Sequence, residues 1–224
     1  MNWVVFIQLQ LIFIGIIYLL ISHHQLNHKV FNTNLFVYET LKEFRQSKSS
    51  EIEENELSIG DDNAKINLIA YTRFDCSYCS DFFKNNLDRL MNDYIENGDL
   101  KLVFRFLTHE SKPNSFFATK AAYFAAEKGF LKLYIDKMTS ISNLNNEAVL
   151  NTIPENLRED FLSYTEDKKV GQLILSQAKK YRQSGINQTP TFFVDQYKII
   201  GNVSYERIKS TIDETLNILE GNHY

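Results

Sequence analysis

Cysteine is scarce in this chain: only two of its 224 residues are cysteines, Cys76 and Cys79. A disulfide between them would close a very small loop, so it would gain little chain entropy and would not hold distant parts of the fold together. Structural cross-linking is therefore excluded as their purpose. The Cys-X-X-Cys spacing instead indicates either redox chemistry or half of a metal site.

An excess of positive charge is also lacking. The chain has 24 lysines and arginines against 28 aspartates and glutamates, which gives a net charge of −4 and a pI of about 5.8. A protein that binds nucleic acid needs a basic face, so no nucleic-acid partner is expected. The hydrophobic content of 44% is ordinary for a folded protein.

The beginning of the chain lacks charge altogether. Residues 3–22 contain no charged side chain, and about 20 apolar residues are enough to cross a bilayer as a helix. A secretory signal peptide would begin with basic residues and end at a small-residue cleavage site, and neither feature is found here. We therefore predict that residues 1–22 form a transmembrane anchor, which contacts the membrane through residues 3–22. A cleaved signal peptide is the alternative.

Two signals conflict on where the rest of the chain lies. Lys29, Lys42 and Arg45 follow the apolar run, and the positive-inside rule would place them in the cytoplasm. Disulfide chemistry favours an oxidising compartment outside the cytoplasm. Because the charge bias is small, we predict that the catalytic domain is extracytoplasmic, either periplasmic or at the cell surface. Residues 23–56 are predicted to form a juxtamembrane helix and a linker.

The folded domain is predicted to span residues 57–221 and to begin with a strand, a helix and a strand. Runs rich in strand-forming residues cover 66–72 and 100–107. Between them, apolar residues recur at helical spacing after the cysteines. These residues are Phe83, Leu87, Leu90 and Tyr94. The order predicts a βαβ unit with two parallel strands.

The second half of the domain is predicted to be helical first and mixed afterwards. Residues 111–184 show helical patterns without a convincing strand. Strand patterns return at 191–194 and 197–200, close enough together for a β-hairpin. A closing amphipathic helix follows, with Ser204 as its predicted N-cap.

The position of the cysteines favours thiol chemistry. Cys76 is placed at the predicted helix start, where unpaired backbone N–H groups favour the thiolate, which is the nucleophilic form. Cys79 lies one turn further on and is predicted to be more buried, so it waits as a thiol until it resolves a mixed disulfide. Asp75, the predicted N-cap, opposes ionisation of Cys76, and Arg73 partly offsets this effect. We predict a moderately lowered pKa for Cys76.

A zinc site is the main alternative for the cysteine pair. Zinc needs about four ligands, but the sequence has no second Cys-X-X-Cys pair and no suitably spaced histidine pair in the folded domain. His24 and His28 stand four residues apart near the anchor, where a place at the membrane–water interface explains them. We therefore expect no metal site.

A second motif is Thr189-Pro190, which directly precedes the predicted strand at 191–194. Only about 5–6% of X–Pro bonds in folded proteins are cis. The residues alone therefore predict an ordinary trans proline in a loop.

Taken together and in this order, the motifs resemble those of DsbA-like thiol–disulfide oxidoreductases, which have a thioredoxin fold. The resemblance rests on Phe-Asp-Cys-Ser-Tyr-Cys at residues 74–79 and on Gly-Ile-Asn-Gln-Thr-Pro-Thr-Phe-Phe-Val at residues 185–194. It extends from about Leu57 to Gly221. It implies an α/β thioredoxin fold with a helical insertion, here preceded by the predicted N-terminal transmembrane helix.

The resemblance also implies roles for individual residues. The bond before Pro190 would be cis and would pack near the cysteines, and the backbone of Thr189 would pair with an extended substrate. Ser77 and Tyr78 would contribute to substrate binding, and the helical insert would cover the active-site end. No bound cofactor is needed, because the dithiol itself carries the electrons.

The predicted function is therefore membrane-anchored exchange of disulfides with extracytoplasmic protein or peptide thiols. A membrane redox partner would reoxidise or re-reduce the cysteine pair. A non-redox peptide-binding or chaperone-like module on the same fold is the alternative. Ala70 departs from the family pattern, because many relatives carry a buried acid there, six residues before the first cysteine, as a proton relay. That relay is predicted to be absent or moved, and the direction of the redox activity stays open.

Overall fold

The computed structural model describes residues 16, 19–20, 22–26, 52 and 56–221. Contacts divide the chain into two units, residues 1–47 and 48–224, and the fold below is that of the second. Among the described residues, no helix has both the length and the apolar character needed to cross a bilayer. The predicted anchor at 3–22 and the juxtamembrane segment lie mostly outside the described residues and stay predictions. His28 also lies outside the described residues.

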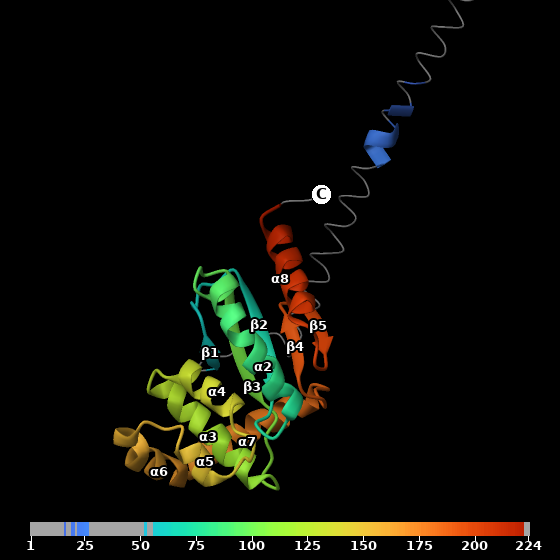
Figure 1. The fold of residues 1–224 in the computed structure, drawn as a ribbon. Coiled ribbons are helices and arrows are strands. Elements are labelled where there is room, and N and C mark those ends of the chain that lie inside the picture. Colours follow the sequence, from blue (N-terminus) through green and yellow to red (C-terminus); the bar gives the residue numbers. More distant parts are fainter. Residues whose placement is uncertain (1–15, 17–18, 21, 27–51, 53–55, 222–224) are drawn as a thin grey trace, which may run out of the picture. The chain divides into compact units, whose positions relative to one another are not determined.

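A five-stranded sheet forms the centre of the second unit (Figure 1). Its strand order is β1-β3-β2-β4-β5, and β2 runs parallel to β3 while the other neighbours are antiparallel. The strands are β1 (Leu57–Ile59), β2 (Ile66–Thr72), β3 (Leu100–Phe106), β4 (Thr191–Val194) and β5 (Tyr197–Ile200). The predicted βαβ unit with a parallel pair and the predicted hairpin are confirmed.

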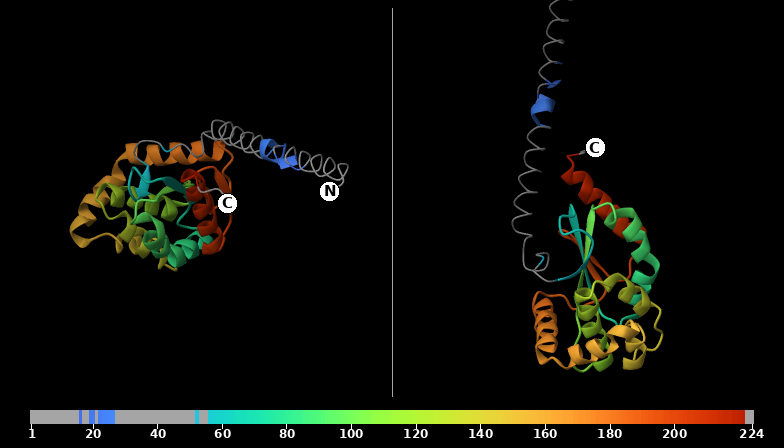
Figure 2. Two further views of the ribbon diagram at one scale, coloured as in Figure 1. Left: turned by 90° about the horizontal axis from the view of Figure 1, so that it is seen from above. Right: turned by 90° about the vertical axis from the view of Figure 1, so that its left-hand side faces the viewer.

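The central strand β2 is buried on both faces, which is why its sequence is almost continuously apolar. Leu68 and Ala70 join the larger hydrophobic core, to which α2 (Ser77–Leu90) and α8 (Tyr205–Leu219) also contribute. Ile69 and Tyr71 point to the other face and join a smaller core with Tyr181. The right-hand view in Figure 2 shows α2 and α8 on one side of the sheet.

Helix α2 begins directly after Cys76 and contains Cys79. A five-residue π-helix, η1 (Met91–Ile95), follows it. The apolar stripe predicted for this segment is buried along its whole length. Gly98 then turns the chain with φ of +81°, a conformation that glycine adopts at no steric cost. At the other end of the domain, the Ser204 hydroxyl accepts a hydrogen bond from the Arg207 N–H at 3.3 Å, so the predicted cap of α8 is confirmed.

The predicted helical insert is confirmed in kind, because no strand occurs in it. Its elements are α3 (Pro113–Glu127), α4 (Leu131–Thr139), α5 (Asn146–Leu150), the 3₁₀-helix η2 (Glu155–Leu157), α6 (Arg158–Glu166) and α7 (Lys168–Gln183). Figure 1 shows these helices gathered at one end of the sheet, the end at which α2 begins. The insert therefore adjoins the cysteines, as the resemblance implied.

Candidate active site

Cys76 is the N-cap of α2, directly before its first helical residue. Its sulfur accepts a hydrogen bond from the backbone N–H of Cys79, with an N···S distance of 3.3 Å. The expectation that Asp75 caps this helix is wrong. The Asp75 carboxylate is held elsewhere, because the Ser115 hydroxyl donates to it at 3.1 Å and Arg73 lies 3.4 Å from it.

The two thiols are free and differ in burial: Cys76 is 8% exposed and Cys79 is 1% exposed. A hydrogen bond from the Cys79 thiol is the main cause that lowers the pKa of Cys76 to about 6, and burial opposes it. The Thr189 side chain, the Cys79 backbone N–H and the charge of Arg73 also favour the thiolate. The predicted lowering of the Cys76 pKa therefore has a visible cause.

The same hydrogen bond acts on Cys79 in the opposite direction. Donation to Cys76 raises the pKa of Cys79 far above its ordinary value, and burial adds to this effect. A hydrogen bond from the Thr72 side chain opposes the rise in the pKa of Cys79. At neutral pH, the pair therefore carries its negative charge on Cys76 and its proton on Cys79.

The Thr189-Pro190 loop lies beside Cys76, and its peptide bond is cis. The Cys76 sulfur is 3.6 Å from the Thr189 carbonyl oxygen. The trans bond expected from the residues alone is wrong, and the cis bond implied by the resemblance is present. Sheet pairing explains the proximity, because Tyr71 near the end of β2 pairs with Thr191 at the start of β4.

Two cavities open beside Cys76. One, of about 520 Å³, also borders Cys79 and has a lining of both polar and apolar residues. Its apolar wall includes Phe74, Phe83, Phe106, Ile135, Met138 and Ile141. The other, of about 500 Å³, lies between the start of α2 and the cis-proline loop and is lined by Ser77, Tyr78 and Thr189.

The predicted site residues are thus brought together at one end of the sheet. Cys76, Ser77 and Thr189 border the same cavity, and Tyr78 borders it with a side chain that is 61% exposed. Pro190 adjoins them through its cis bond to Thr189. Their roles in binding and catalysis stay predictions that this arrangement supports.

Sequence reasoning missed two residues of the site, Thr72 and Arg182. Thr72 ends β2 and reaches the Cys79 sulfur. Arg182 lies near the end of α7, and its guanidinium donates to the carbonyls of Leu107 and Thr108 at 2.9 and 2.5 Å. Neither belongs to a recognisable motif. For Thr72, the only available signal was its place at the end of the strand that leads into the cysteine motif.

No acid stands at the position of the family's proton relay. Ala70 is fully buried on the α2 side of the sheet, and its neighbours across the ladders are Phe104 and Phe192. A buried acid, Glu56, lies on the opposite face of the sheet. It pairs with Arg105, which also donates a hydrogen bond to the Tyr71 hydroxyl. Thr72, two residues beyond Ala70, is the polar side chain that reaches Cys79 from this strand.

Comparison with known proteins agrees with this fold. The family model described as thioredoxin matches residues 52–214. The chain belongs to the thioredoxin family. A curated relative, the probable disulfide bond formation protein D of Bacillus anthracis, is 22% identical over 170 residues, which cover 71% of this chain and 77% of the relative.

Two solved structures illustrate the likeness. The oxidised BdbD of Bacillus subtilis superposes with a TM-score of 0.61 at 19% identity, covering 73% of this chain and 94% of that one. The thiol–disulfide exchange protein α-DsbA2 of Wolbachia pipientis gives a TM-score of 0.62 at 20% identity, covering 80% and 98%. The predicted resemblance to DsbA-like proteins is confirmed, and the relatives that the chain resembles are thiol–disulfide oxidoreductases, as predicted.

Proposed function

We propose that this thioredoxin-family protein exchanges disulfides with protein or peptide substrates through Cys76 and Cys79. One observation supports the proposal above all. The sulfur with the lowered pKa lies at a helix start, 3.6 Å from the carbonyl of Thr189 and on the border of two cavities. A cysteine with a purely structural role requires neither a lowered pKa nor a position on the border of a cavity.

The reaction takes place in two thiol–disulfide exchanges. The Cys76 thiolate attacks one sulfur of a substrate disulfide, which forms a mixed disulfide and releases the other substrate sulfur as a thiolate. Cys79 then loses its proton and attacks the Cys76 sulfur, which closes the internal disulfide and releases the second substrate thiolate. Two electrons pass to the substrate, and the reverse sequence oxidises a substrate dithiol.

The cis-proline loop is proposed to align the substrate. An extended peptide that pairs with the backbone of Thr189 would hold its cysteine against Cys76, as in other recognition by strand addition. Ser77 and Tyr78 would form the opposite wall of the same cavity. The dithiol is its own electron carrier, so this mechanism requires no cofactor.

We further propose that the N-terminal apolar run anchors the protein in a membrane, with the catalytic domain in an oxidising, extracytoplasmic compartment. The support is the absence of charge in residues 3–22 together with the thiol chemistry. A membrane redox partner would restore the starting state of the pair, because the anchor would confine both proteins to one surface.

Variants of the two cysteines test the exchange. Cys76→Ser is expected to abolish reduction of a model disulfide, whereas Cys79→Ser is expected to accumulate a mixed disulfide that mass spectrometry detects. The matched control is Ser80→Ala, because Ser80 lies beside the pair and its hydroxyl donates to the Thr139 carbonyl. A Cys76→Ser protein that reduced the model disulfide at the normal rate would refute the proposal.

A titration against glutathione separates this function from a non-redox binding module. A redox-active pair gives a defined equilibrium with glutathione. Judged by the potentials of known thioredoxin-fold proteins, a midpoint of about −120 mV would indicate an oxidant and one of about −270 mV a reductant. An idle pair would give no defined equilibrium and an ordinary alkylation profile.

A further inference from the structure

A third, smaller cavity adjoins the active site and has a different character from the other two. Its volume is about 250 Å³, and it shares Arg73, Asp75, Leu107 and Arg182 with the cavity that borders Cys76 and Thr189. A chain that passes Cys76 along that cavity can therefore place a neighbouring side chain in the smaller one.

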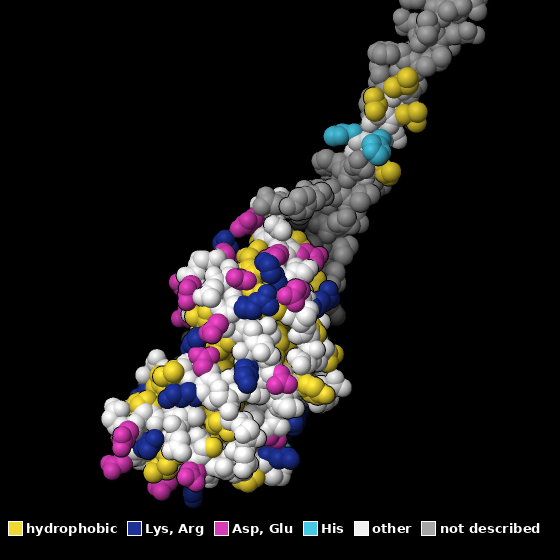
Figure 3. Space-filling view, viewed as in Figure 1, with side chains coloured by type: hydrophobic (Ala, Val, Ile, Leu, Met, Phe, Trp, Pro, Cys, Tyr) yellow, Lys and Arg dark blue, Asp and Glu magenta, His cyan; other side chains and the backbone are white. Residues whose placement is uncertain are grey.

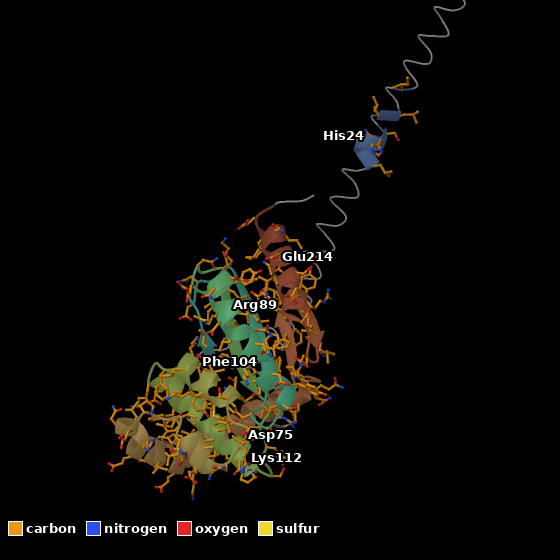
Figure 4. All side chains as sticks on the ribbon, in the orientation of Figure 1. His24, Asp75, Arg89, Phe104, Lys112 and Glu214 are labelled. Atoms are coloured by element: carbon orange, nitrogen blue, oxygen red, sulfur yellow. The ribbon has the colours of Figure 1, made fainter. Side chains whose placement is uncertain are left out.

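The lining of this small cavity is positively charged. Arg73, Lys112 and Arg182 are cations, whereas Asp75 is the single acid among the lining residues. Figure 4 shows Asp75 and Lys112 close together where α2 and α3 begin. On the face of the domain seen in Figure 3, acidic and basic side chains are instead interspersed. The cavity is thus a local excess of positive charge in a chain whose net charge is −4.

The single acid offsets only one of the three cations. Asp75 accepts from the Ser115 hydroxyl at 3.1 Å, and its only ion pair within the described part of the chain is the 3.4 Å contact to Arg73. Lys112 is exposed and lies in no ion pair among the described residues. Its charge is therefore available to a ligand in the cavity.

Hydrogen-bond donors accompany the charge. The Thr108 hydroxyl is buried without a hydrogen-bond partner among the described residues, and Thr108 lines the cavity. Buried polar atoms normally have a partner, so this hydroxyl is a hydrogen-bonding group that a molecule in the cavity could satisfy. The Nδ1 atom of His109 accepts from the Ser111 N–H at 3.1 Å, which leaves Nε2–H of the neutral ring as a further donor.

We propose that this cavity is a subsite for the carboxylate of an acidic residue near the substrate's reactive cysteine. The inference rests on the proposed exchange function and narrows its substrate class to acidic peptides. Charge-assisted hydrogen bonds to a carboxylate are about twice as strong as neutral ones. The subsite would favour formation of the mixed disulfide with such peptides over neutral or basic ones.

Three matched peptides test the subsite. Each carries one cysteine as its mixed disulfide with methanethiol, has blocked termini, and has Glu, Gln or Lys on both sides of the cysteine. In the Cys79→Ser variant, which cannot resolve the product, the Cys76 thiolate attacks the peptide sulfur, releases methanethiolate and forms the peptide mixed disulfide, and quenched mass spectrometry follows the rate. We expect the Glu peptide to react about tenfold faster than the Gln peptide, and the Lys peptide to react slowest. Added salt should reduce the difference.

Variants locate the effect. Lys112→Glu is expected to remove or reverse the preference for the Glu peptide, and Lys112→Arg to keep it. Lys169→Glu makes the same charge change at an exposed position that borders none of the three cavities, and it should keep the preference. Equal rates for the Glu and Gln peptides, or an unchanged preference in Lys112→Glu, would overturn the inference alone. A protein that reacts with none of the peptides would overturn the proposed function as well.

Discussion

The two faces of the central sheet stabilise buried charge in different ways. On the face toward α7, the Glu56 carboxylate meets the Arg105 guanidinium at 2.6 Å, and both side chains are almost fully buried. On the face toward α2, Ala70 provides no acid, and the thiolate of Cys76 is favoured mainly by hydrogen bonds from neutral groups. On one face a carboxylate is thus paired with a guanidinium, and on the other a thiolate is stabilised by hydrogen-bond donors that are mostly neutral.

This difference separates stability from reactivity. A buried ion pair has both partners permanently charged, so loss of one partner leaves an uncompensated charge in the core. A thiolate held by neutral donors can lose its charge when it bonds to a substrate sulfur, without leaving a counter-charge behind. The predictions below test whether the two faces are as independent as this comparison requires.

The largest effect is expected on the ion-pair face. Glu56→Ala would leave Arg105 buried without its carboxylate and should lower the free energy of unfolding by about 3–5 kcal/mol, as measured by urea denaturation. The double variant Glu56→Leu with Arg105→Met should recover most of this loss. If Glu56→Ala also shifted the thiol titration of Cys76, the two faces would not be independent.

The next effect concerns pH and the reduced thiol pair. The pKa of Cys76 falls from its ordinary 9.0 to about 6 on folding, so its thiolate stabilises the folded state above pH 9 and this contribution is lost as the pH falls through 6. Each pKa unit corresponds to about 1.4 kcal/mol, which bounds the loss at roughly 4 kcal/mol. Urea denaturation of the reduced protein at pH 8 and pH 5 measures it. The oxidised protein, which has no thiolate, should lack this dependence.

A smaller change should follow from Thr72→Val, which keeps the shape of the side chain but removes the hydroxyl that hydrogen-bonds Cys79. Because that hydrogen bond lowers the pKa of Cys79, its loss should slow resolution of the mixed disulfide by about tenfold or less. Rapid alkylation of Cys76 should keep its normal rate. Equal slowing of both steps would show that Thr72 acts through the fold and not through Cys79.

The smallest effect is expected for Ser115→Ala, which removes one donor to Asp75. The hydrogen bond contributes about 0.5–1.5 kcal/mol to stability, and urea denaturation should show a loss in this range. Without this donor the Asp75 carboxylate would act more strongly on the Cys76 thiolate, so the alkylation profile of Cys76 should move slightly toward higher pH. An opposite movement would contradict the role assigned to Asp75.

Much of the sheet could be predicted because its strands carry local signals. The bounds of β2, β4 and β5 follow from short apolar runs between turn residues, and β3 ends at Phe106, one residue before its predicted end. Strand β1 was missed because it has only three residues, Leu57–Ile59, and is defined by its pairing with residues 102–104. A pairing over such a distance leaves no mark on a three-residue sequence.

The helical insert was predicted as a block, and its individual helices differ in the local signal that they carry. Helix α4 did carry a signal, because its buried residues recur at helical spacing after Gly129. They are Leu131, Tyr134, Ile135 and Met138. Helix α5 has five residues and one buried side chain, too few for a periodic pattern.

The site itself was predictable where the chemistry lies in a short motif. Cys76 and Cys79 are recognisable from their spacing, and Thr189 with Pro190 from the resemblance. Thr72 and Arg182 were not, because each acts through a partner on another part of the fold. Such contacts depend on tertiary packing, which a local pattern does not encode.

The pairing of Tyr71 with Thr191 affects which sequence changes the site around Cys76 can tolerate. The proximity of the Cys76 sulfur to the Thr189-Pro190 loop follows from the pairing of two adjacent strands, although the helices of the insert lie between these strands in sequence. Replacement of segments within residues 111–184 could alter which proteins dock there while the chemistry stays in place. A single-residue slip between those strands would have the reverse outcome, since it would turn every side chain of one strand to the opposite face.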